Sequence, residues 1–126
     1  MKILVDSSVW IDYFRGGDQS KVLDIYIDEN LISTNDLILS EMIPALKLRK
    51  QGKLINLLNN VHKRPLNIHW DNIIKYQVTC LKNGINKVGI PDLIITDHVI
   101  DNDLILFSLD KHFELISKYI ELKLSF

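Results

Sequence analysis

The sequence predicts an α/β protein in which a mostly parallel sheet is flanked by helices. Short apolar runs, typical of strands buried on both faces, alternate with segments of helical period. Strands that alternate with helices form right-handed crossovers, so their carboxyl ends lie along one edge of the sheet. Two of the most apolar strands end in an acid, Asp6 and Asp110, at the edge where ligands of open α/β sheets bind.

The size and composition are those of one globular domain, which we expect to span residues 1–126. Charged residues make up 25% of the chain and hydrophobic residues 47%, and no apolar run is long enough to cross a bilayer. We expect no secretion signal, because the amino terminus shows one lysine and then a strand. The single cysteine, Cys80, cannot form an internal disulfide, so we expect it to fill the core from a helix in a cytoplasmic protein.

Five strands are expected from apolar runs that end at polar or turn residues. The first run begins at Ile3 and stops at Asp6. Asp6 is followed by Ser7 and Ser8, and one of these three residues could alternatively do no more than cap the next helix. The other four expected strands cover Leu31–Ser33, Pro65–Ile68, Asp103–Leu109 and Glu121–Phe126.

Helices are expected between these strands because apolar residues recur there at spacings of three and four. The segment His69–Lys82 is the longest example, and an Asn83-Gly84 stop ends it. Its residues at core spacing are Trp70, Ile73, Ile74, Gln77 and Leu81. The other expected helices cover Val9–Phe14, Ser20–Glu29, the segment after the Thr34–Asp36 cap, Leu54–Val61, the segment after Pro91, and Glu114–Ile120.

Glu41 lies in a segment that allows two interpretations. If the capping residues Thr34–Asp36 begin a helix, Glu41 shares its apolar, inward face. Pro44 argues against this because it removes an interior hydrogen bond, and the alternative ends a strand at Leu39 and begins the helix near Ser40. In both cases Glu41 points toward the sheet or its edge, where an acid is costly unless something pairs with it.

Asp92 occupies the start of another helix. Pro91 suits a first helical turn, and the helix dipole favours a negative charge there. The rest of this helix is apolar on several sides, which predicts burial against the sheet and a fixed position for Asp92. Since the helix leads into the strand that ends at Asp110, and Glu41 follows the second strand, these acids and Asp6 can converge in one crevice.

Four carboxylates in one crevice would repel one another, and without a cation some would be protonated at neutral pH. An all-oxygen site without paired cysteines or close histidine pairs selects a hard ion, Mg²⁺ or Mn²⁺. Such an ion would lower the pKa of a bound water to make a nucleophile and would offset charge on an attacked phosphate. The sequence therefore predicts phosphoryl chemistry that needs no side-chain nucleophile.

The formal net charge of −1 excludes a protein that holds nucleic acid through a general positive field. It does not exclude a nucleic-acid substrate, because bound metal reverses the local sign where a phosphate must sit. The basic segment Lys47–Lys53 is a local exception to the acidic balance. Its cations either complement a helix C-terminus or contact RNA or a partner.

Three further polar residues lie near the predicted site. Ser8 and Ser108 either orient a water or phosphate, as substrate-positioning residues, or cap local backbone amides. His112, two residues after Asp110, is either functional or has a surface or packing role.

Four segments, in this order and spacing, resemble the successive signatures of PIN-domain ribonucleases. They are Val5–Ile11, Ser40–Glu41, Ile90–Ile95 and Phe107–Phe113. The similar branch of that family is the VapC toxin of type II toxin-antitoxin pairs, and the resemblance spans essentially the full length of the chain. The order of four motifs is far more specific than any one of them.

This resemblance implies a three-layer, PIN-like fold with a mostly parallel five-stranded sheet and a Mg²⁺ or Mn²⁺ site. It implies endonucleolytic hydrolysis of RNA, commonly tRNA, rRNA or mRNA, together with homodimerisation and inhibition by a small cognate antitoxin. By motif, Asp6, Glu41, Asp92 and Asp110 match the acidic quartet of catalytic and metal-binding residues. Many members carry a further acid where this chain has His112, so a fifth carboxylate is missing.

Three alternatives have different sequence requirements. A phosphoacceptor receiver domain needs adjacent acids after the first strand and a Lys-Pro pair after the fifth, whereas Asp6 stands alone and the last strand runs to the terminus. An acid phosphatase needs an Asp-x-Asp pair, but Ser8 occupies the second place. The third alternative is a binding module without nuclease activity, which either binds Mg²⁺ in an acidic pocket or is inert, with acids that only cap helices.

Overall fold

The computed structural model describes residues 2–125 and has a four-stranded parallel sheet at its centre. The strand order is β3-β2-β1-β4. The strands are β1 (Ile3–Val5), β2 (Ile32–Thr34), β3 (His62–Lys63) and β4 (Ile105–Phe107). The parallel sheet flanked by helices confirms the predicted fold class.

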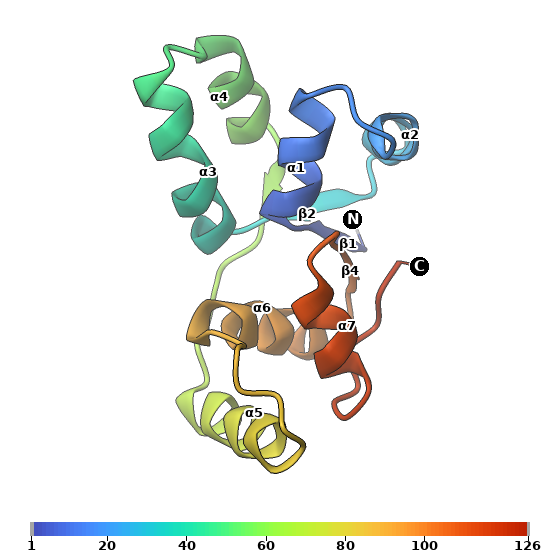
Figure 1. The fold of residues 1–126 in the computed structure, drawn as a ribbon. Coiled ribbons are helices and arrows are strands. Elements are labelled where there is room, and N and C mark those ends of the chain that lie inside the picture. Colours follow the sequence, from blue (N-terminus) through green and yellow to red (C-terminus); the bar gives the residue numbers. More distant parts are fainter. Residues whose placement is uncertain (1, 126) are drawn as a thin grey trace.

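Helices cover both faces of this sheet, which gives three layers (Figure 1). α1 and α2 lie on one face and α6 and α7 on the other, while α3 and α4 form a hairpin beside α1, and α5 packs outside α6. The helices are α1 (Ser7–Phe14), α2 (Ser20–Asp28), α3 (Asp36–Leu48), α4 (Gly52–Asn59), α5 (Trp70–Lys82), α6 (Ile90–Asp101) and α7 (Lys111–Ser117). Within residues 2–125, none of them has the length and apolarity needed to span a membrane.

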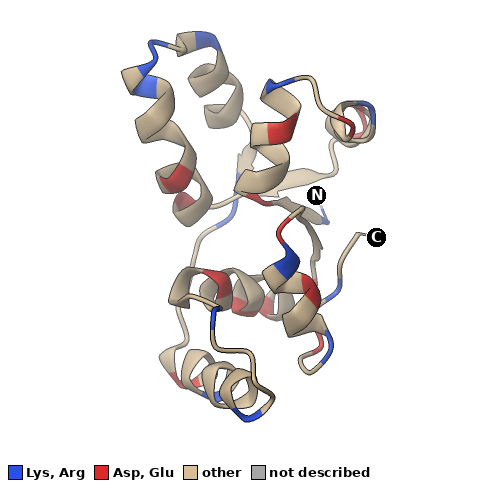
Figure 2. Cartoon of the chain, viewed as in Figure 1, with Lys and Arg blue, Asp and Glu red and all other residues tan. Residues whose placement is uncertain are grey.

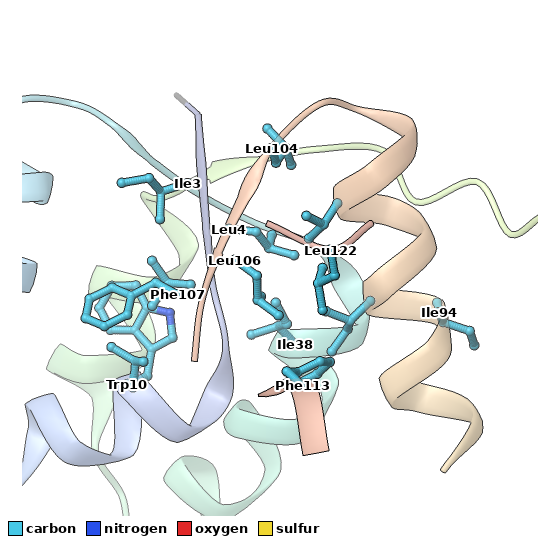
Figure 3. Packing of buried hydrophobic residues seen from close by; sticks show 14 of the residues in the cluster. Ile3, Leu4, Trp10, Ile38, Ile94, Leu104, Leu106, Phe107, Phe113 and Leu122 are labelled. Carbon is cyan, nitrogen blue, oxygen red and sulfur yellow. The ribbon is translucent and has the colours of Figure 1, made fainter. Parts of the chain in front are cut away.

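The core lies on both faces of the central strands. Successive side chains of a strand point to opposite faces, and Figure 3 shows this for β4, where Phe107 packs beside Trp10 of α1 while Leu106 points toward Phe113 of α7. All four of these side chains are at most 1% exposed. Burying a side chain of this kind contributes roughly 1.5–3 kcal/mol, so the central strands are firmly fixed at their carboxyl ends.

The third strand differs from the prediction. Pro65–Ile68 was expected to form it, but these residues lie outside every strand, and the strand that pairs with β2 is His62–Lys63. Both of its residues are exposed, so no apolar pattern marks it in the sequence. Proline cannot donate a backbone hydrogen bond, and the pairing ends just before Pro65, with Arg64 N donating to Thr34 O at 2.9 Å.

The fifth strand is reduced to a single parallel bridge. Leu124 pairs with Leu106 of β4, through Leu106 N to Lys123 O at 2.8 Å and Ser125 N to Leu106 O at 3.0 Å. The segment predicted as Glu121–Phe126 therefore lies along the β4 edge of the sheet, with its last residue outside the described part of the chain. The sheet thus has four strands and one bridge.

Helix α3 begins at Asp36, which rules out the alternative in which it starts near Ser40. Asn35 fixes this start because its Oδ1 accepts a hydrogen bond from Ile38 N at 2.9 Å. The helix continues through Pro44 because its buried residues, Ile38, Met42 and Leu46, form one face on either side of the proline. Glu41 is exposed beside that face rather than within it.

Helix α5 buries a narrower face than its sequence predicts. Cys80 is buried in it, as expected, and so is Ile73. Trp70, Ile74 and Leu81, which were also expected in the core, are more than half exposed. The reason is that α5 makes its main helix contact with α6, so the apolar residues on its opposite side are left exposed within residues 2–125.

Candidate functional site

The four predicted acids come from different elements that meet near the carboxyl ends of β1 and β4. Asp6 follows β1 and precedes α1, and Asp110 follows β4 and caps α7. β1 and β4 are paired neighbours, with Val5 opposite Phe107, so the two acids leave the sheet at the same edge. Asp92 lies in the first turn of α6, and Glu41 lies on α3.

Asp6 is buried and its carboxylate is held by two hydroxyl groups. Ser8 Oγ donates to Asp6 Oδ2 at 2.7 Å, and Ser108 Oγ donates to the same oxygen at 2.8 Å. The two serine oxygens in turn accept hydrogen bonds from Leu109 N at 2.9 Å and Asp110 N at 3.0 Å. These serines therefore link the Asp6 carboxylate to the loop that carries Asp110, a role that their hydroxyl type alone did not reveal.

Asp92 is held at the start of α6 by its helix and by an imidazole. Gly89 N donates to Asp92 Oδ2 at 3.4 Å, completing a capping arrangement, and His112 Nδ1 lies 3.2 Å from the same oxygen. Burial raises the pKa of the Asp92 carboxyl, and the charge of Asp110 adds to this rise. The hydrogen bonds from His112 and Gly89 act in the opposite direction, because they favour the ionised form.

Asp92, Asp110 and His112 form a compact trio. Each offers one ligand atom, and these three atoms all lie within 4.8 Å of one another. His112 Nδ1 is 3.6 Å from Asp110 Oδ1, and the same carboxylate oxygen accepts a hydrogen bond from His112 N at 2.9 Å. His112 therefore lies beside both carboxylates, and whether it has a function there stays a prediction.

Glu41 completes the acidic environment from the opposite side, although it lies outside the trio. Partial desolvation raises the pKa of its carboxyl, and the negative charges of Asp6, Asp92 and Asp110 raise it further. All four acids therefore interact electrostatically. Their mutual repulsion is what a bound cation would relieve.

The donor set fits a divalent cation. Carboxylate oxygens are the preferred ligands of Mg²⁺ and Mn²⁺, and the compact trio adds one imidazole nitrogen. Asp6 and Glu41 supply further negative charge close to this trio. The residues that would hold the ion are therefore Asp92 and Asp110, with Asp6 and Glu41 beside them.

Two sets of polar contacts fix α6, which carries Asp92, to its neighbouring helices. Asn35 Nδ2 donates to His98 Nδ1 at 2.8 Å, which joins the start of α3 to α6. Asp97, also buried in α6, accepts from Asn72 Nδ2 at 3.0 Å and contacts His69 Nδ1 at 2.9 Å, which joins α6 to α5. The sequence analysis used only the apolar sides of α6, so the hydrogen bonds of Asp97 and of His98 Nδ1 are seen only in the fold.

With this geometry established, the comparison with known families identifies the class of protein. The PIN-domain family model matches residues 3–119, and the chain therefore belongs to the PIN-domain family. No curated protein matches it.

Solved structures share the fold at low sequence identity. A chain of VapBC2 from Rickettsia felis, bound to a promoter DNA fragment, is 16% identical with a TM-score of 0.79, covering 99% of this chain and 98% of that one. VapBC-1 from nontypeable Haemophilus influenzae is 18% identical with a TM-score of 0.75, covering 99% and 97%. VapC20 from Mycobacterium tuberculosis, a Sarcin-Ricin loop cleaving toxin, is 12% identical with a TM-score of 0.63, covering 95% and 98%.

The raised pKa of Glu41 leads to a prediction about stability. The folded protein binds the Glu41 proton more tightly than the unfolded chain does. Above the raised pKa, where Glu41 is ionised, this difference lowers the free energy of unfolding. In EDTA at pH 7, Glu41→Gln should therefore melt at a higher temperature than the wild type. The difference should shrink as the pH falls through the raised pKa and vanish below the ordinary value of 4.5.

Thermal unfolding followed by circular dichroism checks this, with Glu29→Gln as the control. Glu29 is exposed at the end of α2, so its substitution makes the same change of charge outside the site. A Glu41→Gln variant that melts below the wild type at pH 7 without metal would contradict the repulsion described above.

Proposed function

We propose that this PIN-domain protein is a divalent-metal-dependent endoribonuclease and the toxin of a type II toxin-antitoxin pair. The observation that carries the proposal is the convergence of Asp6, Glu41, Asp92 and Asp110 at one edge of a PIN fold. Family membership supports the activity, and the fold shared with VapBC chains supports the toxin role. We propose a cytoplasmic location, which is consistent with an RNA substrate and with a single cysteine that forms no internal disulfide.

The acids would divide the work of phosphodiester hydrolysis. When bound, Mg²⁺ or Mn²⁺ would supply an activated water at neutral pH and offset charge on the attacked phosphate. Asp92 and Asp110 would hold the ion, and Asp6 would present a carboxylate whose orientation the two serines fix. Glu41 is the proposed general base, because its raised pKa makes it a better proton acceptor than an ordinary glutamate.

Ser8 and Ser108 act on the substrate indirectly in this proposal. Both hydroxyl protons are directed at Asp6 Oδ2, so the serines would position the carboxylate that faces the ion. Their predicted direct contact with a water or phosphate stays a prediction.

The basic segment Lys47–Lys53 is the proposed contact for the RNA backbone outside the cleavage site. Its cations cluster where α3 ends and α4 begins, on the same hairpin whose other end carries acids (Figure 2). All four of its lysines and arginines are exposed. A local basic surface of this kind can bind phosphates although the net charge of the protein is −1.

The proposed nuclease requires its acids. Asp6→Asn or Asp92→Asn removes negative charge from the cation site, so RNA cutting in Mg²⁺ or Mn²⁺ should fall by at least about 100-fold. A gel assay on total RNA, with and without EDTA, measures this, and circular dichroism confirms folding. Asp36→Asn is the matched control because Asp36 is an exposed acid of α3 that pairs with Lys63.

The outcomes separate the nuclease from the alternatives. Wild-type cutting rates in either variant would show that the residue is not part of the catalytic site. Metal binding without any RNA cleavage by the wild type would favour the alternative of a Mg²⁺-binding module without nuclease activity. The receiver-domain alternative no longer applies, because the chain belongs to the PIN family.

A small antitoxin is the proposed inhibitor, and the structure offers a groove for it. The groove lies between α1, α3 and α4, has a volume of about 380 Å³, and reaches Glu41. Met42, Leu46 and Leu54 give it apolar walls, and Arg15 and Arg49 line it with positive charge. An inhibitor segment with apolar and acidic side chains would fit this lining and block access to Glu41.

The antitoxin proposal predicts growth arrest on expression, relieved by co-expression of a small protein encoded beside the gene. Ala45→Gln should keep the arrest but weaken the relief, because a longer side chain fills part of the groove. Leu48→Gln is the control on the same helix, since Leu48 is 86% exposed and does not line the groove. Colony counts at graded antitoxin expression measure the relief. Equal relief for the wild type and Ala45→Gln would exclude this groove as the inhibitor site.

We also propose a homodimer formed through the outer face of α5. This face consists of Trp70, Ile74, Val78 and Leu81, spaced three or four residues apart and each between 46% and 61% exposed. A contiguous apolar stripe along one helix is typical of an interaction surface. In the proposed dimer, the same face of a second copy covers this stripe, so the two copies are related by two-fold symmetry.

Sedimentation velocity of the purified protein tests the dimer. The wild type should sediment as a species of twice 14.6 kDa. Ile74→Glu should sediment as a monomer, because it places a charge in the apolar contact. Ile25→Glu on α2, where Ile25 is 54% exposed, should remain dimeric. If the wild type is still monomeric at a concentration about 100 times a typical micromolar Kd, the homodimer is ruled out.

A further inference from the structure

His112 lies where a cation ligand would be expected. Its Nδ1 atom is 3.2 Å from Asp92 Oδ2 and 3.6 Å from Asp110 Oδ1. The backbone holds the residue in place, because His112 N donates to Asp110 Oδ1 at 2.9 Å in the first turn of α7. The imidazole thus faces both carboxylates of the compact trio at once.

These separations match those of neighbouring ligands around one ion. An ion bound at about 2.1 Å from each ligand atom places adjacent ligands about 3.0 Å apart in an octahedral site, and slightly further apart at wider angles. The distance from Nδ1 to Asp92 Oδ2 is close to that spacing, and the distance from Nδ1 to Asp110 Oδ1 corresponds to a wider angle at the ion. The three ligand atoms all lie within 4.8 Å of one another, so one ion could lie between them.

A nitrogen ligand changes which ion the site prefers. Mg²⁺ favours oxygen ligands, whereas first-row transition ions also bind imidazole well. We propose that His112 Nδ1 is a ligand of the cation beside Asp92 and Asp110, so that the site binds Mn²⁺ more tightly than Mg²⁺. This inference rests on the proposed function, because it concerns the metal site of the nuclease.

The competing explanation is that His112 only donates a hydrogen bond that orients Asp92. Both roles would affect RNA cutting, so activity cannot separate them. The discriminating measurement is electron spin-echo envelope modulation of the protein loaded with one equivalent of Mn²⁺ and no RNA. A coordinated imidazole produces ¹⁴N modulation, and an imidazole that only orients Asp92 does not.

Two variants and one control make the assignment specific. His112→Asp and His112→Gln should bind Mn²⁺ without ¹⁴N modulation. In calorimetric titrations, the ratio of Mn²⁺ affinity to Mg²⁺ affinity should be lower in His112→Asp than in the wild type by about tenfold or more. The reason is that an oxygen replaces the nitrogen ligand at this position. His62→Gln, on the exposed edge strand β3, should behave as the wild type in both measurements. Circular dichroism without metal confirms that each variant folds.

The outcomes distinguish this inference from the nuclease proposal. A wild type that cuts RNA and binds Mn²⁺ without ¹⁴N modulation would overturn the role of His112 and leave the nuclease intact. Modulation that persists in His112→Asp would overturn it too, because another nitrogen would be the ligand. A wild type that binds neither ion and cuts no RNA would overturn both.

Discussion

Repulsion between carboxylates at the edge of the sheet is the constraint on which the rest of this structure depends. Parallel pairing of β1 with β4 brings Asp6 and Asp110 to the same edge, and α6 and α3 add Asp92 and Glu41. The pKa values of Glu41 and Asp92 are raised first by burial and then by the charges of the neighbouring acids, so the fold concentrates this charge in a partly desolvated place. Without a cation, the repulsion between these acids lowers the stability of the folded protein. In exchange, the ligands are already in place when a cation binds.

The fold resists this repulsion with polar contacts that leave the acids little freedom. Asp6 cannot turn away without losing both serine hydroxyls. Helix α6, which carries Asp92, is joined to α3, which carries Glu41, by the buried Asn35–His98 contact, and to α5 by the contacts of Asp97. A buried polar group that lost its partner would cost about 1–3 kcal/mol, so these links favour one relative position of α3, α5 and α6.

The proposed partners would use surfaces whose chemistry differs from that of the site. The groove between α1, α3 and α4 combines apolar walls with arginines and opens next to Glu41. An occupant of that groove would therefore block the acids without having to bind them. The apolar outer face of α5 belongs to the helix that lies beyond α6, so a second copy bound there would leave the groove accessible.

The sequence by itself determined the fold class and three of the four strands, because buried apolar runs are local signals. It also singled out four acids, which the fold places within electrostatic reach of one another. It misplaced the third strand at Pro65–Ile68 and overestimated the buried face of α5, because an exposed edge strand and an uncovered helix face have no local signature. Only the tertiary structure decided where Glu41 lies, that Ser8 and Ser108 hold Asp6, and that His112 faces two carboxylates. These facts depend on contacts between residues up to 102 positions apart, which no spacing along the chain can specify.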